Sequence, residues 1–213
     1  DRRFGFVTTT QAVVPHVFLL GGFVDRILRL FLSEQRPMDN VEQAPDLPEE
    51  PEHALGNVST RCFYHGLCFP RALGHYYRRW VLLEGVDEAE VEAWASSYLA
   101  ILKAATLAAG GRPLVLKNPP DMARLPHILA LFPEARFVHI VRDPYVLFPS
   151  IRNFYGRSIE DWQLQDIDDA ELEDHVFAIY DGMMSAFQRD RHLIPPGQLA
   201  EVRFEDLEAD PVG

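Results

Sequence analysis

Two cations, each at the end of a predicted strand, and a hydroxyl two turns into a predicted helix are the residues best suited to bind a charged ligand. Lys117 ends an apolar run at 113–116, and Arg142 ends a second run at 137–141 that is rich in β-branched and aromatic residues. Ser150 follows Arg142 by eight residues. Ammonium, guanidinium and hydroxyl groups all donate hydrogen bonds to phosphate oxygens, so this set indicates an anionic ligand. The alternative for Arg142 is a surface ion pair with a neighbouring acid.

The elements that would bring these groups to one edge are predicted within residues 112–153. The two apolar runs are typical of buried strands, and an apolar helical stretch at 125–132 joins them. A strand, a helix and a second strand form a βαβ unit, in which the strands are parallel and ligands bind beyond their carboxyl ends. Asp143 and Pro144 are favoured N-cap and first-turn residues, so a helix is expected to begin there, with Ser150 two turns into it.

Several segments resemble, in order along the chain, those of the sulfotransferases that use 3′-phosphoadenosine 5′-phosphosulfate (PAPS). They are LVLKNPPDMARLPHILALFPEARF, FVHIVRDPYVLFPS, EVRFEDLEADP and, more weakly, RPMDNVEQAPDLPEEPEHAL. The resemblance implies an α/β, P-loop-NTPase-like fold with a parallel sheet flanked by helices. It also implies transfer of a sulfuryl group from PAPS, without a metal, to a hydroxyl or amine on a small-molecule, sugar or lipid acceptor.

The same resemblance implies roles for individual residues. Arg142 and Ser150 would hold the 3′-phosphate of the donor, and Lys117 would lie near the transferred sulfuryl group. Phe204 falls where the family often has a Tyr near the adenine, so it could offer only ring contact.

The base that takes the acceptor's proton is expected within an acidic stretch with four prolines, residues 36–57. In the resembling family a carboxylate or a His serves as this base. Glu50 and Glu52 are the best-placed candidates, with Glu49 and His53 beside them. Composition alone favours a plainer interpretation, in which the stretch is a long, solvated loop.

Composition limits the class of protein. The 32 acidic and 20 basic residues give a net charge of −12, which argues against a nucleic-acid or anionic-membrane binder because such proteins carry a basic face. A length of 213 residues suits one domain, 1–213. Cys62 and Cys68 complete no zinc pattern and are expected to be free thiols, which fits a cytoplasmic location. The apolar stretch 13–32 contains several charges, so amphipathic helix is expected there and no membrane span.

Helical periodicity is clearest at 87–109, where Asp87 is the expected N-cap and Gly110-Gly111 the expected stop. The aromatic residues of 59–80 would either form core, which is favoured, or line an acceptor pocket. Elsewhere we expect helices at 24–31 and 172–191, loop at 154–170 and a strand at 199–204.

Two features of the resembling family are missing from this sequence: a Gly/Ser/Thr-rich phosphate loop after a strand near the N-terminus, and a basic Gly-containing segment near the C-terminus. We therefore expect a partial domain, incomplete at both ends, that transfers little sulfate alone. Two alternatives stay open. One is a degenerate, non-catalytic sulfotransferase-like binding module. The other is a nucleotide-dependent phosphotransferase, which would need Mg²⁺ ligands and a lysine-bearing P-loop.

Overall fold

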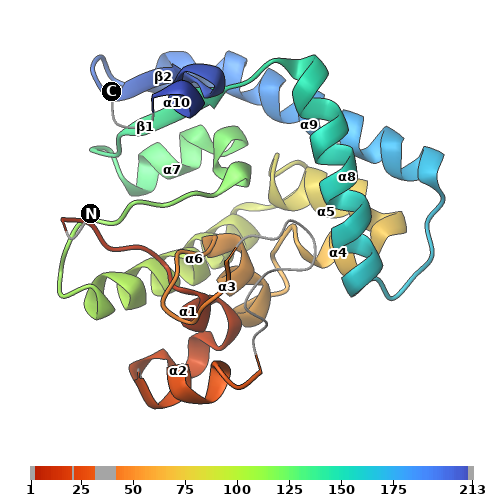
Figure 1. Cartoon of the computed structure of the whole chain (residues 1–213). Coiled ribbons are helices and arrows are strands. Elements are labelled where there is room, and N and C mark those ends of the chain that lie inside the picture. The colour runs from red at the N-terminus through yellow and green to blue at the C-terminus, as the bar shows by residue number, and fades with distance from the viewer. Residues whose placement is uncertain (1–2, 21, 32–41, 211–213) are drawn as a thin grey trace.

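The computed structural model describes residues 3–20, 22–31 and 42–210, which form a body of packed helices with a small parallel sheet at one edge (Figure 1). Strands β1 (Phe137–Val141) and β2 (Leu199–Arg203) pair in parallel, with Phe137 opposite Leu199 and Val141 opposite Arg203. The helices are α1 (Thr9–Val13), α2 (Gly22–Leu28), α3 (Pro51–Val58), α4 (His65–Cys68), α5 (Leu73–Trp80), α6 (Glu88–Ala108), α7 (Leu125–Leu131), α8 (Pro144–Trp162), α9 (Asp169–Asp190) and α10 (Phe204–Ala209). Short 3₁₀ helices are η1 (Pro15–Leu20), η2 (Pro70–Ala72), η3 (Pro119–Ala123) and η4 (Arg191–Leu193).

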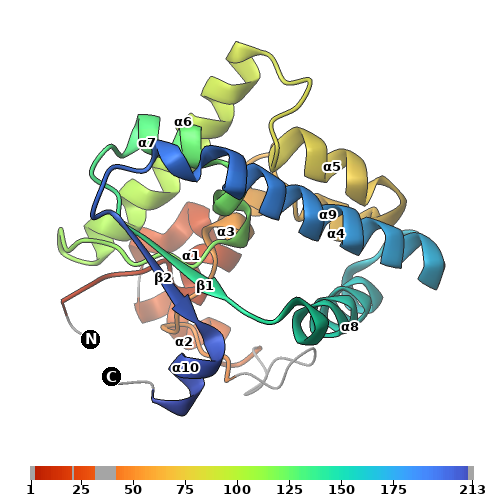
Figure 2. The same ribbon diagram turned by 90° about the horizontal axis from the view of Figure 1, so that it is seen from above.

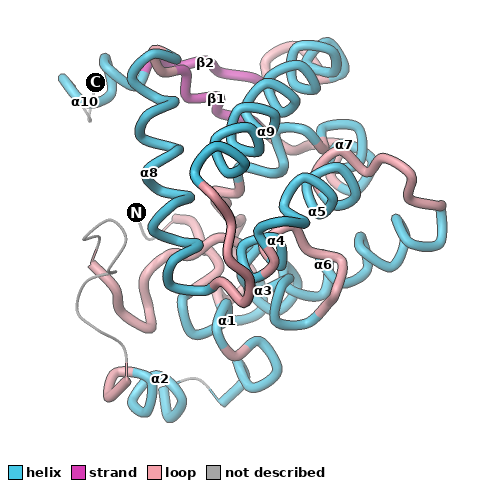
Figure 3. Tube along the Cα trace, turned by 90° about the vertical axis from the view of Figure 1, so that its right-hand side faces the viewer, coloured by secondary structure: helices cyan, strands magenta, loops and turns pink. Residues whose placement is uncertain are grey.

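Two long helices, α8 and α9, connect β1 to β2 and lie side by side (Figures 1 and 3). The expected start of α8 is confirmed, because the Asp143 side chain caps the helix by accepting a 2.9 Å hydrogen bond from the Tyr145 amide. The expected loop at 154–170 is wrong for its first half, since α8 continues to Trp162. Pro149 removes one amide donor inside α8, but apolar residues such as Ile159 pack into the core and keep the helix continuous.

The expected strand at 113–116, paired in a βαβ unit with β1, is not formed in the described part of the chain. Instead Leu114 makes a single parallel bridge with Gly5, fixed by 2.8 Å backbone hydrogen bonds from Gly5 to Pro113 and from Val115 to Gly5. A strand is stabilised by a ladder of such bonds, and one bridge does not make a ladder. The parallel partner of β1 is β2, from much later in the sequence.

β1 was also expected to be buried, and it is not buried on both faces. Val138 and Ile140 are 67% and 50% exposed, whereas His139 packs against the Phe187 ring at 4.1 Å between ring centres. Only one face of β1 therefore packs against the rest of the molecule, although its sequence is apolar on both faces.

The core lies between α3, α5, α6, α8 and α9, where buried side chains from all five helices form one cluster. α6 contributes Trp94 and Tyr98, whose rings stack at 5.5 Å, and it begins and ends as predicted. Asp87 accepts a 2.8 Å hydrogen bond from the Glu90 amide, and Gly110 and Gly111 take positive φ values of 69° and 80°.

The acidic stretch 36–57 is only partly a loop. Residues 36–41 lie outside the described part of the chain, 42–50 are irregular, and α3 begins at Pro51. Pro51 occupies the first helical turn, where the amide hydrogen that proline lacks would have no helical acceptor. The long-loop interpretation is therefore wrong from residue 51 onward. Glu52 lies in a helix and not in a solvated loop.

Prediction for helix packing. α9 crosses close to α5 at Gly182 (Figure 2), where an added Cβ would overlap the Tyr77 hydroxyl and lie 3.1 Å from its ring carbon Cζ. We expect Gly182→Ala to lower the free energy of unfolding by about 1–3 kcal/mol from overpacking, more than the roughly 1 kcal/mol that alanine returns as helix propensity. Urea denaturation measures this difference.

The matched control is the same substitution in a Tyr77→Phe background, which removes the overlapping oxygen. That hydroxyl is buried without a hydrogen-bond partner among the described residues, so Tyr77→Phe alone should be nearly neutral. An equal loss from Gly182→Ala in both backgrounds would contradict the steric explanation.

Candidate functional site

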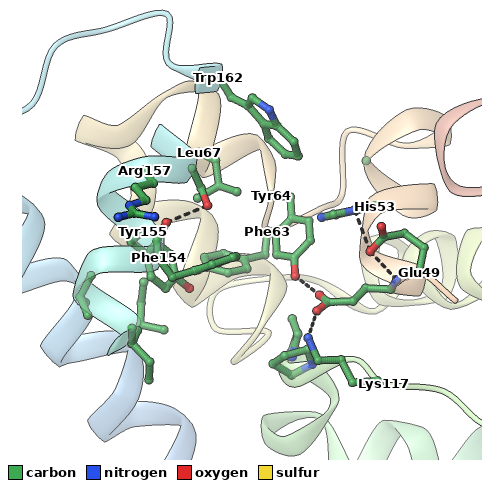
Figure 4. Close-up of a pocket in the computed structure, with 18 of the residues that line it drawn as sticks. Glu49, His53, Phe63, Tyr64, Leu67, Lys117, Phe154, Tyr155, Arg157 and Trp162 are labelled. Atoms are coloured by element: carbon green, nitrogen blue, oxygen red, sulfur yellow. Dashed lines mark hydrogen bonds and ion pairs between the residues drawn. The ribbon is translucent and has the colours of Figure 1, made fainter. Parts of the chain in front are cut away.

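A pocket of about 1300 Å³ lies between α3, α4, α8, α9 and the segment that follows Lys117 (Figure 4). One part of its wall is apolar and aromatic, and another carries charged and polar side chains. The apolar part includes Phe63, Leu67, Leu147, Phe154, Met183 and Met184, and the polar part includes Glu49, Glu50, His53, Lys117, Ser150 and Arg157. Some aromatic residues of 59–80 are core, as favoured, but Phe63 and Tyr64 also face this pocket.

Glu50 forms the centre of the polar wall. Its carboxylate pairs with Nζ of Lys117 through Oε1 and accepts a hydrogen bond from the Tyr64 hydroxyl at Oε2. The Glu50 side chain is 13% exposed, whereas that of Lys117 is 77% exposed. Burial first, and then the charge of Glu50, raise the pKa of Tyr64 well above its usual value. Tyr64 therefore stays protonated and donates a hydrogen bond to Glu50 Oε2, while the remaining lone pairs of Glu50 stay available to a bound hydroxyl.

The His53 imidazole lies beside the carboxylate of Glu49, the residue before Glu50. His53 Nδ1 lies 3.3 Å from Glu49 Oε1, and the His53 ring lies 4.8 Å from the Tyr64 ring and 5.7 Å from the Trp162 ring, centre to centre. Figure 4 shows these rings on one side of the pocket, across from Phe154 and Tyr155. The rings of Tyr64 and Trp162 therefore lie beside the polar side chains of this wall.

Glu52 lies in a different environment, although it is two residues from Glu50. Its side chain is fully buried and binds Arg124 through two contacts, 2.8 Å to Nη1 and 3.0 Å to Nη2. It also accepts a 3.2 Å hydrogen bond from the Phe63 amide. Burial alone would raise the pKa of Glu52, but Arg124 and these hydrogen bonds hold it below its ordinary value. A buried carboxylate already paired with a guanidinium is poorly suited to take a proton from a substrate, so the geometry favours Glu50.

Two of the residues predicted to bind the donor, Arg142 and Phe204, lie where the two strands end. The guanidinium carbon of Arg142 is 4.5 Å from the centre of the Phe204 ring, and Phe204 opens α10 directly after β2. Ser150 lies in the second turn of α8 and lines the pocket. The structure therefore brings Arg142 to Phe204 and Lys117 to Glu50. The binding roles of these residues stay predictions.

Sequence reasoning missed the importance of three residues. Tyr64 was one aromatic among several, and neither Asn118 nor Arg124 was identified as part of a site. The only local signal was that Asn118 directly follows Lys117. A buried Arg cannot be recognised without its partner, and that partner, Glu52, is 72 residues away.

The described ranges contain no group of three or more His, Cys, Asp or Glu side chains that could hold a metal ion. Over the same ranges, every helix is too short or too polar to cross a membrane.

A model described as the Sulfotransferase family matches residues 29–213. Two curated proteins, both named Omega-hydroxy-beta-dihydromenaquinone-9 sulfotransferase Stf3, come from Mycobacterium bovis and Mycobacterium tuberculosis. Each is 30% identical over 213 residues, which is 100% of this chain and 54% of the relative. The chain thus spans about half the length of the curated relatives it matches.

Two solved structures share the fold. Sulfotransferase STF9 from Mycobacterium avium superposes with a TM-score of 0.72 at 20% identity, covering 99% of this chain and 55% of that one. Sulfotransferase STF1 from Mycobacterium tuberculosis H37Rv superposes with a TM-score of 0.73 at 18% identity, covering 100% of this chain and 58% of that one. These likenesses confirm the predicted α/β sulfotransferase fold.

Prediction for the buried pair. Glu52→Ala leaves the Arg124 guanidinium buried without its main partner, so we expect the free energy of unfolding to fall by about 3–5 kcal/mol in urea denaturation near neutral pH. Because Glu52 has a lowered pKa, the stability it supplies is present above its ordinary value of 4.5 and lost as the pH falls through the lower, folded-state value. The difference between the wild type and the variant should therefore shrink below about pH 4.5.

The control is Glu173→Ala, which removes the partner of Arg152 in an exposed pair at 3.0 Å. Exposed pairs contribute about 0–1 kcal/mol, so this variant should change little. Similar losses in the two variants would mean that burial does not set the strength of the Glu52–Arg124 pair.

Proposed function

The chain belongs to the sulfotransferase family, as its motifs indicated, and from this premise we propose that it forms part of an enzyme that moves a sulfuryl group from PAPS to a hydroxyl acceptor. The observation that carries the proposal is the placement of Glu50 and Lys117 together on the wall of a large pocket. An acid–base group and a cation side by side are what a reaction needs when a proton leaves the acceptor while negative charge builds on the donor.

The residues at the end of β1 fit the donor. PAPS, when bound, supplies the activated sulfuryl group. Arg142 offers a guanidinium to the 3′-phosphate, and Phe204 offers a ring face to the adenine. Their 4.5 Å contact supports the assignment, because it places a phosphate-binding group and a base-stacking group side by side. Ser150, two turns into α8, would add a hydroxyl donor to the same phosphate.

Lys117 and Glu50 would divide the chemistry between them. Lys117 is largely exposed to the pocket, so its ammonium can turn from Glu50 toward the sulfuryl oxygens. That movement releases Glu50 Oε1, which then takes the proton that the acceptor hydroxyl loses. Tyr64 keeps the other oxygen, Oε2, in place. We propose Glu50, and not the buried Glu52, as the general base.

The acceptor we propose is a hydroxyl carried by a largely apolar, lipid-like molecule. The curated relatives are named for a hydroxylated dihydromenaquinone. Here the polar wall with Glu50 faces an apolar surface that includes Phe154 and Met183. An elongated apolar body could lie along that surface while its hydroxyl meets Glu50.

Prediction for donor binding. We expect calorimetry with adenosine 3′,5′-bisphosphate to show binding that Arg142→Ala weakens by about 10- to 100-fold. That range corresponds to losing a charge-assisted hydrogen bond of about 1.5–3 kcal/mol. The control is Arg152→Ala, which removes the same charge from α8 at a residue paired with Glu173. Equal weakening in the two variants, or no binding at all, would contradict the assignment of Arg142.

Prediction for proton transfer. In the whole enzyme, Glu50→Gln keeps the size of the side chain and removes the base, so turnover should fall by about 100- to 10,000-fold while the affinity for adenosine 3′,5′-bisphosphate is retained. Turnover is followed as bisphosphate released from PAPS in the presence of a hydroxylated menaquinone analogue. Glu173→Gln, in the second turn of α9 at a residue paired with Arg152, serves as the control. Turnover at the wild-type level in Glu50→Gln would remove Glu50 from the mechanism.

A further inference from the structure

The ion pair between Lys117 and Glu50 is too weak to fix the position of the Lys117 side chain by itself. The Lys117 side chain is 77% exposed, although that of Glu50 is only 13% exposed, so water screens the lysine end and the pair contributes on the order of 1 kcal/mol. Fixing a long lysine side chain costs up to roughly 2 kcal/mol of conformational entropy, which cancels that gain. The pair therefore forms reliably only if the backbone at residue 117 is already fixed against the backbone at residue 50.

The side chain of Asn118 makes that connection. Its Oδ1 accepts a 3.3 Å hydrogen bond from the Glu52 amide, in the first turn of the helix that Glu50 caps. Its Nδ2 donates a 2.9 Å hydrogen bond to Asp121 Oδ1 and lies 3.5 Å from Glu52 Oε2. One oxygen facing a donor and one nitrogen facing two carboxylates fix the orientation of the amide.

The partners of Asn118 are themselves held by further hydrogen bonds and ion pairs. Asp121 accepts a 2.6 Å hydrogen bond from the Tyr98 hydroxyl and lies 3.4 Å from Arg124 Nη1. Arg124 is fully buried, donates a 2.8 Å hydrogen bond from Nε to the Trp80 carbonyl and binds Glu52. Asn118 thus joins the segment after Lys117 to a buried network that spans α3, α5 and α6.

We propose that Asn118 is a positioning residue, whose amide ties the backbone beside Lys117 to the first turn of α3 and so sets the Lys117–Glu50 pair. A catalytic role for the Lys117–Glu50 pair rests on the function proposed above, whereas the positioning of the pair by Asn118 does not. Without the Asn118 amide, Lys117 and Glu50 would spend most of their time apart, although both side chains would remain.

The sequence offers a direct readout, because Lys103 and Lys117 are its only two lysines. Reductive methylation with ¹³C-formaldehyde labels both amines and keeps their charge, so an NMR spectrum shows two lysine signals. Lys103 lies exposed on α6 and serves as the internal reference. In the wild type we expect Glu50→Gln to move the Lys117 signal and to leave the Lys103 signal in place.

The test is the same Glu50→Gln comparison in an Asn118→Ala background. There the Lys117 signal should respond to Glu50→Gln by less than about half of the wild-type response, because the two side chains are no longer coupled. Turnover should fall by about 10- to 100-fold, since misplaced reacting groups are costly, while the affinity for adenosine 3′,5′-bisphosphate is kept. Asn118→Ser, which cannot reach both partners, should give the same reduction and replaces the alanine variant if that fails to fold.

Asn57→Ala is the matched control. Asn57 also lies on α3 and also anchors it, through a 2.8 Å hydrogen bond to the Ala12 carbonyl, but on the side facing α1. It should lower stability while leaving the Lys117 response intact, which separates positioning from general loosening of the helix. A full Lys117 response in Asn118→Ala would overturn the proposal, whatever the sulfotransferase assays show. A lost response without any sulfate transfer would support the positioning role and count against the proposed function only.

Discussion

The buried ion pair between Glu52 and Arg124 is the interaction on which the rest of the structure depends. Both side chains are fully buried, so each has lost its hydration, and that loss costs several kcal/mol per charge unless close partners replace the water. Here they do. Arg124 is bound by Glu52, by Asp121 and by the Trp80 carbonyl, and its guanidinium lies 5.0 Å from the Trp94 ring. Helices α3, α5 and α6 are held together at this point.

The pair also explains how neighbouring acids come to serve different purposes. Glu50 is the N-cap of α3 and has extended backbone angles, φ −75° and ψ 134°, whereas Glu52 lies within the helix. The change of backbone geometry between them turns one carboxylate toward the pocket and the other into the core. The buried pair of Glu52 with Arg124 fixes the position of this short segment, and this fixes where the Glu50 carboxylate meets the pocket.

The proposed site is assembled from segments that differ in how firmly they are held. The wall with Glu50, Tyr64 and Lys117 rests on the buried network, whereas Arg142 and Phe204 lie at the ends of a two-stranded sheet with a partly exposed face. The chain spans about half the length of its curated relatives, so the activity of the whole protein remains a proposal. The fold and the family do not depend on that proposal.

The sequence by itself determined the features that are encoded locally. The start of α8 at Asp143-Pro144, both ends of α6, the strands β1 and β2, and the family motifs could all be recognised, because capping, periodicity and motif spacing involve residues close together in the chain. The family resemblance also suggested Glu50 and Glu52 as candidates for the general base, but nothing local in the sequence distinguishes one from the other.

Tertiary structure decided the rest. It placed the Glu52 carboxylate against Arg124, 72 residues away, and the Glu52 amide against Asn118, 66 residues away. It left 113–116 with a single bridge instead of a strand, because a ladder depends on a partner that the segment does not contain. Burial and pairing belong to contacts between distant residues, so they emerge only once the chain has folded.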